Sequence, residues 1–594
     1  MSEISLTING KQVKGERGDT ILKVCERSDI YVPTLCHYGG VHEVGTCRMC
    51  VVEVQGGRAL TTACTTPAED GMIVKTESDA IQSLRRATLE LLFSERNHYC
   101  MFCEASGDCE LQALAYRHGM DSVRYPNLYP KMELDTSHPY LALDQNRCVL
   151  CRRCVRVCAE LVGAHSLGMR ERGIETLLAA DGGEPLSASS CVSCGACVQV
   201  CPTGALFDRR SAYRGREKDC TTVKSSCPEC ALGCAVELVA RSGQVLRVEG
   251  DVESPENGGL LCRRGRYESL NGHRERVLQP LVRKGGELAS ASWDEALAAL
   301  RAGIEAAAAA GGAGAVAAVA SARASNEALA ALRGYFQQKL DSPNVGAIGA
   351  AASPDGYPAA TLQDIRQADL IILAGEDAGA NHQVVEFAVS QAVEQHGAAL
   401  IVVGSAARRL QKQACVVVPA GSDEVARALA TLTAAGSESL KRIACAERAV
   451  FVVGAPVTAV PQALAAAAQS ARDGWPRVLA LAPKGNSRGA AQAGLNGGAS
   501  VAKGVKAAFI MAGDDTEMLD RFLPQRDEIG FLAVQASYRS PLVEMADVVL
   551  PAPVWTEKAG TMVNAQGREV SLRPAVAPPA GVRDEADVLA ALSQ

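Results

Sequence analysis

The chain has little net charge, few aromatic residues and no long apolar run, and these shortages exclude several classes of protein. Lys and Arg number 60 and Asp and Glu 67, which gives a formal net charge of −7 over 594 residues. Such a balance gives no indication of binding to nucleic acid or to an anionic membrane surface. Aromatic residues make up only 4 % of the chain, although its 47 % hydrophobic content allows sizeable cores.

No stretch of 18 or more strongly apolar residues is present, so the sequence predicts no direct membrane insertion. The nearest approach, GIEAAAAAGGAGAVAAVAS at 303–321, consists largely of Ala and Gly and is too weakly apolar. The opening MSEISLTINGKQVKG is polar and strand-like, without the pattern of a signal peptide. We therefore expect a cytoplasmic protein of about four domains, held at most peripherally on the inner face of a membrane through its partners.

Cysteine is the exception among the scarce residues, with 23 copies, of which only Cys415 and Cys445 lie beyond residue 262. A disulfide framework is typical of small secreted chains, and neither condition fits here. Ordinary buried cysteines do not explain clusters at spacings of two and three residues. The pattern favours thiolates that are kept reduced in order to bind metal.

The first cysteine group has the spacing C-x10-C-x2-C-x13-C and consists of Cys36, Cys47, Cys50 and Cys64. Ahead of it, ISLTINGKQV predicts a hairpin around Asn9-Gly10, and DTILKVCERSDI predicts a short helix that starts at Asp19. This order resembles a β-grasp ferredoxin, in which four such cysteines hold a [2Fe–2S] cluster, with zinc as the alternative. Cys25 lies in the predicted helix and is interpreted as a core residue.

The second group combines three cysteines with a histidine in ERNHYCMFCEASGDCELQ, residues 95–112, after a segment that is helical by its apolar spacing. Cys100, Cys103 and Cys109 leave one place open on a [4Fe–4S] cluster. Every other group is complete, and His98 is within loop reach, so we predict His98 as the fourth ligand. The alternative is a solvent-facing loop histidine. An imidazole in place of a thiolate leaves the cluster less negative, which tends to raise its potential.

The third group consists of two runs, CVLCRRCVRVC and CVSCGACVQVCPTG, each spaced C-x2-C-x2-C-x3-C. This is the bacterial ferredoxin pattern for two [4Fe–4S] clusters, in which the fourth cysteine of each run serves the other cluster. The first cluster is therefore expected on Cys148, Cys151, Cys154 and Cys201. The second is expected on Cys191, Cys194, Cys197 and Cys158.

The fourth group has the spacing C-x2-C-x3-C-x27-C and consists of Cys227, Cys230, Cys234 and Cys262. It suits a further [4Fe–4S] cluster, and the enclosed AVELVARSGQVLRVEGD is strand-like. Cys220 lies nearby without a spacing partner. Together the groups predict one [2Fe–2S] and four [4Fe–4S] clusters, an array suited to carrying single electrons rather than to binding substrate.

Residues 276–594 alternate short apolar runs with helical patterns. The runs LIILAGED, ALIVVGS, CVVVPAGS, AAFIMAGDD, FLAVQAS and ADVVLPAP are typical of buried parallel strands, and SDEVARALATLTAA is helical. Strand ends followed by Gly or Asp indicate a doubly wound sheet. GAGAVA at 312–317 partly matches the dinucleotide glycine pattern, but it follows a helical segment rather than a strand.

These groups, in this order, resemble the large iron–sulfur subunit of NADH:quinone oxidoreductase (respiratory complex I) and its relatives in NAD-linked hydrogenases and formate dehydrogenases. LQPLVRKGGELASASWDEALAAL and VWTEKAGTMVNAQGR resemble segments of the same family. The resemblance implies a multidomain α/β chain. Its expected parts are a β-grasp [2Fe–2S] domain (1–78), a His/Cys3 [4Fe–4S] segment (79–140), a 2[4Fe–4S] ferredoxin-like domain (141–218), a molybdopterin-oxidoreductase-type [4Fe–4S] domain (219–275) and a truncated, degenerate molybdopterin-type doubly wound α/β domain (276–594).

The resemblance does not imply a molybdopterin site in the last part. Arg264 stands where the catalytic relatives usually carry a lysine between cluster and pterin. Around 347–361, where a catalytic relative would place a metal-binding Cys, Sec or Ser, the sequence offers only Ser353, and a serine in a Gly/Ala/Pro loop is usually a turn residue. The chain also ends soon after EKAGT, where the catalytic relatives add a further domain. We therefore expect no molybdopterin.

The resemblance implies an electron-transfer subunit of an NADH-linked complex, without a substrate site of its own. Its partners would be a flavin- and NADH-binding subunit, a small [2Fe–2S] subunit and a downstream subunit, with quinone as the final acceptor. An alternative is the same relay in an NAD(P)-linked NiFe hydrogenase or formate dehydrogenase complex. The H-x-C spacing of His98 and Cys100 is closer to these relatives, because the respiratory subunits would place the histidine where Arg96 stands. Two further alternatives are a catalytic formate dehydrogenase subunit with a Mo/W-pterin and a zinc-binding scaffold.

Overall fold

The computed structural model divides into two compact units, Met1–Cys220 and Thr221–Gln594. It describes all residues except 1–2, 271–273, 353–356, 376–380, 405–407, 422–423, 433–437, 455–471, 497–502, 516–525, 527 and 594. Ser353 therefore lies outside the described residues. Within the described part of the chain, no helix is long and apolar enough to cross a membrane.

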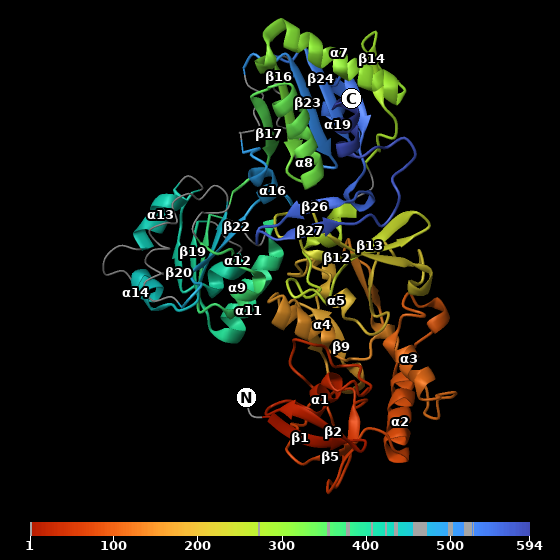
Figure 1. Ribbon diagram of the computed structural model, residues 1–594. Helices are drawn as coiled ribbons and strands as arrows, with labels where there is room; N and C mark the ends of the chain where they lie inside the picture. The colour runs from red at the N-terminus through yellow and green to blue at the C-terminus, as the bar shows by residue number, and fades with distance from the viewer. Residues whose placement is uncertain are drawn as a thin grey trace. The chain divides into compact units, whose positions relative to one another are not determined.

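The first unit begins with a five-stranded sheet in the order β2-β1-β5-β3-β4 (Figure 1). Its strands are β1 (Glu3–Ile8), β2 (Lys11–Glu16), β3 (Val51–Val54), β4 (Thr61–Thr62) and β5 (Ile73–Lys75). The hairpin predicted around Asn9-Gly10 is confirmed: β1 and β2 pair antiparallel, and both turn residues have positive φ.

Helix α1 (Ile21–Arg27) packs its apolar face on this sheet, and Cys25 is fully buried there, as expected. The helix starts two residues later than predicted, at Ile21. The hydroxyl of Thr20 caps it by accepting the N–H of Lys23, whereas the Asp19 carboxylate is bound by the side chains of Lys23 and Arg27. Both Asp and Thr can serve as the N-cap of a helix. Because the Asp19 carboxylate binds the two cationic side chains, Thr20 is the residue that caps α1.

Helix α2 (Asp79–Glu95) forms where the apolar spacing predicts it, with Ser78 as its N-cap. Its Arg85 is completely buried and donates to the carbonyl oxygens of Met49 and Val51 at 3.0 and 3.1 Å. The same guanidinium bonds Glu77 at 3.1 Å. Arg85 therefore fastens α2 to the cysteine-bearing segment that leads into β3.

The rest of the first unit consists of short elements between the cysteine runs. A three-stranded sheet has the order β10-β7-β6, and β8 and β9 form a two-stranded sheet. The elements are α3 (Glu110–Arg117), β6 (Leu134–Asp135), β7 (Leu141–Asp144), α4 (Arg153–Arg156), β8 (Leu167–Arg170), β9 (Leu177–Ala180), α5 (Ala196–Gln199) and β10 (Leu206–Asp208).

The second unit opens with a three-stranded antiparallel sheet that carries the fourth cysteine group. It consists of β11 (Thr221–Ser226), β12 (Ala235–Arg241) and β13 (Gln244–Gly250), followed by the short helix α6 (Arg263–Arg266). The strand-like segment predicted between Cys234 and Cys262 is thus the β12–β13 hairpin.

A seven-stranded sheet in the order β15-β14-β25-β24-β23-β16-β17 follows, parallel from β17 to β25 and antiparallel in its last two strands. Its strands are β14 (Leu281–Lys284), β15 (Glu287–Ser290), β16 (Val316–Ser321), β17 (Asn344–Ile348), β23 (Ala507–Gly513), β24 (Phe531–Ala536) and β25 (Val548–Pro551). The helices around it are α7 (Trp293–Gly311), α8 (Asn326–Leu332), α16 (Ser487–Gln492), α18 (Pro541–Met545) and α19 (Glu585–Ser593). A β26–β27 hairpin (Gly560–Val563, Glu569–Leu572) lies against α8 and β11.

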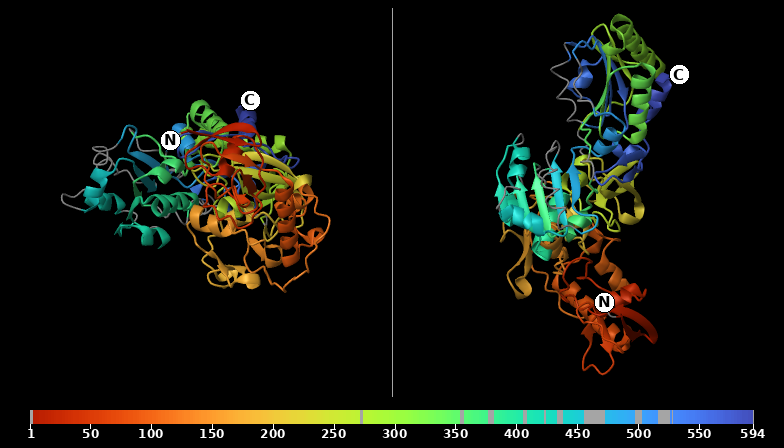
Figure 2. Two further views of the ribbon diagram at one scale, coloured as in Figure 1. Left: turned by 90° about the horizontal axis from the view of Figure 1, so that it is seen from below. Right: turned by 60° about the vertical axis from the view of Figure 1, so that its left-hand side comes forward.

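A separate five-stranded sheet, entirely parallel, has the order β20-β19-β18-β21-β22 (Figures 1 and 2). Its strands are β18 (Leu370–Ala374), β19 (Ala399–Val403), β20 (Val416–Val418), β21 (Ala449–Gly454) and β22 (Arg477–Leu481). Its helices are α9 (Leu362–Gln367), α11 (Gln383–His396), α12 (Arg408–Gln413), α13 (Val425–Leu432) and α14 (Glu438–Cys445). All six apolar runs named from the sequence form strands, but they are divided between two sheets where one doubly wound domain was expected.

Removal of the Arg85 guanidinium should loosen the first cysteine segment. In Arg85→Met the apolar stem stays, but two buried carbonyls lose their donor, which should cost about 2–4 kcal/mol of local stability. Hydrogen exchange followed by mass spectrometry should show faster exchange over residues 49–54. Arg58→Met, at an exposed position of the same unit, is the matched control and should leave the exchange unchanged. Equal exchange in both variants would contradict this role of Arg85.

Candidate metal centres

The first group of cysteines lies together beside β3 and β4. The sulfur atoms of Cys50 and Cys64 are 3.3 Å apart. A hydrogen bond with Cys47 lowers the pKa of Cys36 to about 6, and Cys36 in turn acts electrostatically on Cys50 and Cys64. Three of the four are buried, and Cys47 is half-buried. The loop between α1 and β3, together with Cys64 after β4, thus brings all four thiols to one place.

The second group lines one small cavity, which brings His98 together with Cys100, Cys103 and Cys109. The Nε2 atom of His98 is buried and has no hydrogen-bond partner, while the backbone of Leu92 hydrogen-bonds the ring. Burial, together with the charges of Arg147 and Arg96, lowers the pKa of His98 to about 4. The imidazole is therefore neutral, oriented by α2, and left with a free nitrogen at the cysteines.

Gly204 completes this cavity from the far end of the ferredoxin-like segment, a role that the sequence interpretation missed. A Cβ atom at this position would lie 2.5 Å from the sulfur of Cys103. Only glycine allows such a close approach. The available signal was the Cys-Pro-Thr-Gly end of the second run, which spacing alone assigns to another cluster.

In the ferredoxin runs, the fourth cysteine of each run lies close to the earlier cysteines of the other run. Burial, with a contribution from the nearby Cys201, raises the pKa of Cys148 to about 11 and that of Cys151 to about 12. Cys201 acts on Cys154 in the same way. Cys158, from the first run, acts instead on Cys191 and Cys197 of the second run.

Backbone N–H groups point at the sulfurs of these runs. The N–H of Leu150 lies 3.4 Å from the sulfur of Cys148, and the N–H of Ser193 lies 3.4 Å from that of Cys191. Both donors have positive φ, 54° and 57°, an uncommon conformation for residues other than glycine. Such N–H groups are the donors that iron–sulfur sites direct at cluster and cysteine sulfur.

The fourth group is buried in the second unit. Burial raises the pKa of all its thiols, and each interacts electrostatically with other members, among them Cys262 with Cys227, Cys230 and Cys234. The N–H of Gly265 donates to the sulfur of Cys262 at 3.3 Å, and a Cβ there would lie 3.2 Å from that of Cys227. Another close-packed glycine therefore borders this group.

A buried ion network anchors the fourth group to the seven-stranded sheet. Glu229, inside the CPEC motif, pairs with Arg323 at 2.9 Å and with Arg264 at 3.5 Å. Arg323 also pairs with Asp514 at 3.3 Å, at the end of β23. Arg264, at the position where a lysine is expected in a catalytic relative, is thus engaged with a carboxylate of this chain.

Over the described residues, no three His, Cys, Asp or Glu side chains converge as the ligands of one metal ion do. Zinc needs all four ligands within about 2.0–2.3 Å of one ion. The ligands of a four-iron cluster each bind a different iron, so their sulfur atoms stand farther apart. The remaining cysteines are apart from these groups: Cys415 and Cys445 are exposed, and the Cys220 thiol bonds the carbonyl of Arg216.

Family models match the chain from end to end in the expected order. They are a 2Fe-2S iron-sulfur cluster binding domain (1–79), the NADH-ubiquinone oxidoreductase-G iron-sulfur binding region (85–124), the ferredoxin-like domain of NADH-quinone oxidoreductase subunit 3 (138–207), the molybdopterin oxidoreductase Fe4S4 domain (220–269) and molybdopterin oxidoreductase (276–594). The predicted order of a 2Fe-2S domain, further iron–sulfur regions and a molybdopterin-oxidoreductase-like domain is confirmed.

Individual relatives agree with these models. A G-type subunit of NADH-quinone oxidoreductase from Rhizobium meliloti is 32 % identical over 73 % of this chain and 51 % of its own length. The alpha subunit of NADPH-Fe(3+) oxidoreductase of Geobacter sulfurreducens is 33 % identical over 69 % of this chain and 49 % of its own. A crystal structure of NAD+-reducing [NiFe]-hydrogenase in the H2-reduced state matches at 37 % identity, covering 36 % of this chain and 91 % of that one, with a TM-score of 0.34.

The chain spans about half the length of the curated relatives it matches. More than half of it fits the molybdopterin oxidoreductase model. Two further models carry the name of NADH oxidoreductase, and they cover the His/Cys segment and the ferredoxin runs before residue 210. The chain therefore belongs to the molybdopterin oxidoreductase family, in the group of the large iron–sulfur subunit of NADH:quinone oxidoreductase.

Proposed function

We propose that this chain is the iron–sulfur electron-transfer subunit of an NADH-linked multisubunit oxidoreductase of the complex I type. The observation that carries the proposal is that the cysteines gather into separate sets, buried or half-buried. Glycines pack closely against some of their sulfur atoms, and backbone N–H groups donate to others. Complete sets of four protein ligands leave no position for a substrate, so such groups suit electron relay better than substrate chemistry.

The proposed ligands follow these sets. The [2Fe–2S] cluster would be held by Cys36, Cys47, Cys50 and Cys64. Four [4Fe–4S] clusters would be held by His98 with Cys100, Cys103 and Cys109, by Cys148, Cys151, Cys154 and Cys201, by Cys191, Cys194, Cys197 and Cys158, and by Cys227, Cys230, Cys234 and Cys262. The clusters would act as one-electron carriers, and the residues of this chain would hold each cluster in place and separate it from solvent.

The donor would be a flavin- and NADH-binding subunit accompanied by a small [2Fe–2S] subunit, and quinone would be the final acceptor through a downstream subunit. A relay in an NAD(P)-linked hydrogenase or formate dehydrogenase is the second candidate, favoured by the H-x-C spacing of His98 and Cys100. The name of the Geobacter relative shows that similar chains serve another donor and acceptor. Identification of the subunits that co-purify with this chain separates these candidates.

We infer that the first sheet with α1 is a β-grasp domain and that residues 276–594 act as a scaffold without molybdopterin. The antiparallel β1–β2 pair, the parallel β1–β5 pair and the packed helix support the first inference. The pairing of Arg264 with Glu229 supports the second, since it engages the position at which catalytic relatives link cluster and pterin. We therefore place the catalytic work of the complex in partner subunits.

Metal analysis tests the whole proposal. The purified, anaerobically handled chain should contain about 18 iron atoms, the content of one two-iron and four four-iron clusters. It should contain neither molybdenum nor tungsten in stoichiometric amount. A protein with about one molybdenum or tungsten atom per chain would instead be a catalytic subunit, and a colourless zinc protein would be a scaffold.

Replacement of His98 by cysteine should keep the second cluster but lower its midpoint potential. The change exchanges a neutral imidazole for a charged thiolate, and the shift should be on the order of 100 mV, judged from the effect of histidine ligands in Rieske centres. A redox titration followed by EPR measures it. An unchanged signal and potential would show that His98 is not a ligand. His396→Cys, at an exposed histidine at the end of α11, is the control.

Gly204→Ala should eliminate the same cluster by a different route. The added methyl group would occupy the space of the Cys103 sulfur, 2.5 Å away, so about four iron atoms and one EPR signal should be lost. Gly168→Ala is the matched control, because no atom lies within 4 Å of its Cβ position. Full iron content in Gly204→Ala would place the cluster away from this cavity.

A further inference from the structure

The two cluster loops of the ferredoxin-like runs match in their backbone but differ in one side chain. Leu150 and Ser193 occupy the same place in their runs, two residues after the first cysteine, with nearly equal φ. Each directs its N–H at the sulfur of that first cysteine at 3.4 Å. Leu150 has no polar side-chain atom, whereas Ser193 adds a hydroxyl at the equivalent point.

The hydroxyl of Ser193 meets a buried histidine from a distant segment. His138 Nε2 and Ser193 Oγ lie 3.1 Å apart, and the two residues are only 4 % and 9 % exposed. The Nδ1 atom of His138 faces the backbone N–H groups of Tyr140 and Leu141, at 3.2 and 3.4 Å.

These contacts decide the direction of the hydrogen bonds. Backbone N–H groups only donate, so Nδ1 of His138 must accept and the ring must carry its hydrogen on Nε2. Nε2 therefore donates to the Ser193 oxygen. The hydroxyl hydrogen of Ser193 then points away from Nε2 of His138 and can be donated to another acceptor, and Ser193 itself stands between Cys191 and Cys194 in the chain.

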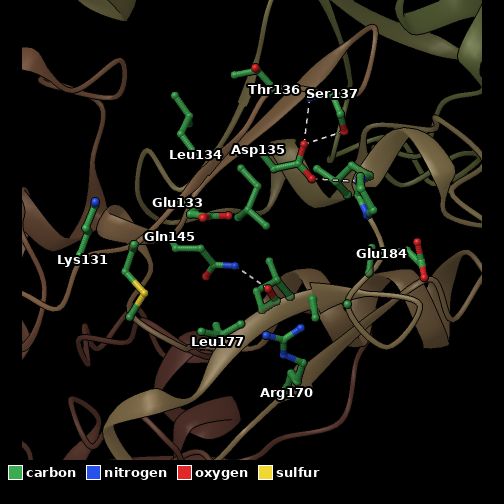
Figure 3. A pocket seen from close by; sticks show the side chains of 18 residues that line it. Lys131, Glu133, Leu134, Asp135, Thr136, Ser137, Gln145, Arg170, Leu177 and Glu184 are labelled. Carbon is green, nitrogen blue, oxygen red and sulfur yellow. Dashed lines mark hydrogen bonds between the residues drawn. The ribbon is translucent and has the colours of Figure 1, made fainter.

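His138 is itself held firmly. Arg209 donates to its carbonyl oxygen. Just before it, Asp135 accepts the N–H and hydroxyl of Ser137 at 2.9 and 2.6 Å, and the N–H of Leu186 at 2.9 Å (Figure 3). These bonds form one wall of a cavity of about 750 Å³ and tie the segment of His138 to the stretch that leads into the second run. The Nε2–H group of His138, which donates to Ser193, is therefore held in place before any cluster binds.

We propose that His138 is a positioning residue for the cluster held by Cys191, Cys194, Cys197 and Cys158. Through Ser193 it directs a hydroxyl hydrogen bond to cluster or cysteine sulfur, and this makes that cluster easier to reduce than its neighbour on Cys148, Cys151, Cys154 and Cys201. Hydrogen bonds to sulfur raise the potential because they stabilise the more negative, reduced cluster. The inference rests on the proposed function, since it requires both clusters.

The test measures both midpoint potentials in the full iron-loaded chain by EPR-monitored titration. Ser193→Ala and His138→Phe should each lower the potential of the second cluster alone. The equilibrium between the two singly reduced forms should shift about tenfold, as for one charge-assisted hydrogen bond, or roughly 60 mV at 59 mV per tenfold. The double variant should shift no further, because both changes remove one relay. His138→Gln, whose amide can replace the Nε2 donor, should restore most of the potential.

Leu150→Ala is the matched control in the first loop and should leave the second cluster unchanged. Unchanged potentials in Ser193→Ala at full iron content would overturn the proposal, as would equal shifts of both clusters. If His138→Phe loses iron, Ser193→Ala and His138→Gln decide the question. A wild-type chain without the two EPR signals would overturn the proposed function itself, before any variant is compared.

Discussion

The burial of many thiolates is the constraint on which the rest of this structure depends. A buried anion is costly unless charges or hydrogen bonds compensate it, and burial here raises the pKa of most cysteines of the four-iron groups. The protein meets this cost with backbone N–H groups directed at sulfur and with glycines that let the chain approach closely. Gly204 and Gly265 are the clearest cases, because a Cβ at either would press on a cysteine sulfur.

Arginines connect the cysteine loops of the first unit to one another. Arg156, within the first ferredoxin run, donates to the carbonyl of Cys36 in the first group. Arg153 forms a bidentate pair with Glu110, next to Cys109 of the second group. Arg147 donates to the carbonyl of Asn97, next to His98. A guanidinium fork is well suited to such links because its donors are rigid and remain charged when buried. Successive groups are thereby held at fixed separations, as an electron relay requires.

In the second unit, arginine–carboxylate pairs link the fourth cysteine group to the seven-stranded sheet. Glu229 holds two arginines beside the fourth cysteine group, and Arg323 continues the network to Asp514 on the seven-stranded sheet. The positive charges are thus balanced by the chain itself. This agrees with a domain that retains the molybdopterin oxidoreductase fold while acting as a support for its cluster segment.

The sequence by itself determined the β1–β2 hairpin, helix α2 and the six apolar strands, and it supplied the proposed grouping of the cysteines. These features depend on spacing within one segment, where the covalent chain limits the possibilities. The contribution of Gly204 to the His98 cavity, the bond between Leu92 and the His98 ring, and the contact of His138 with Ser193 were decided by the tertiary structure alone. So was the division of the last 300 or so residues into two sheets, because buried parallel strands have the same pattern in either sheet. Each of these depends on which segments pack together, and residues tens of positions apart carry no local sign of their future neighbours.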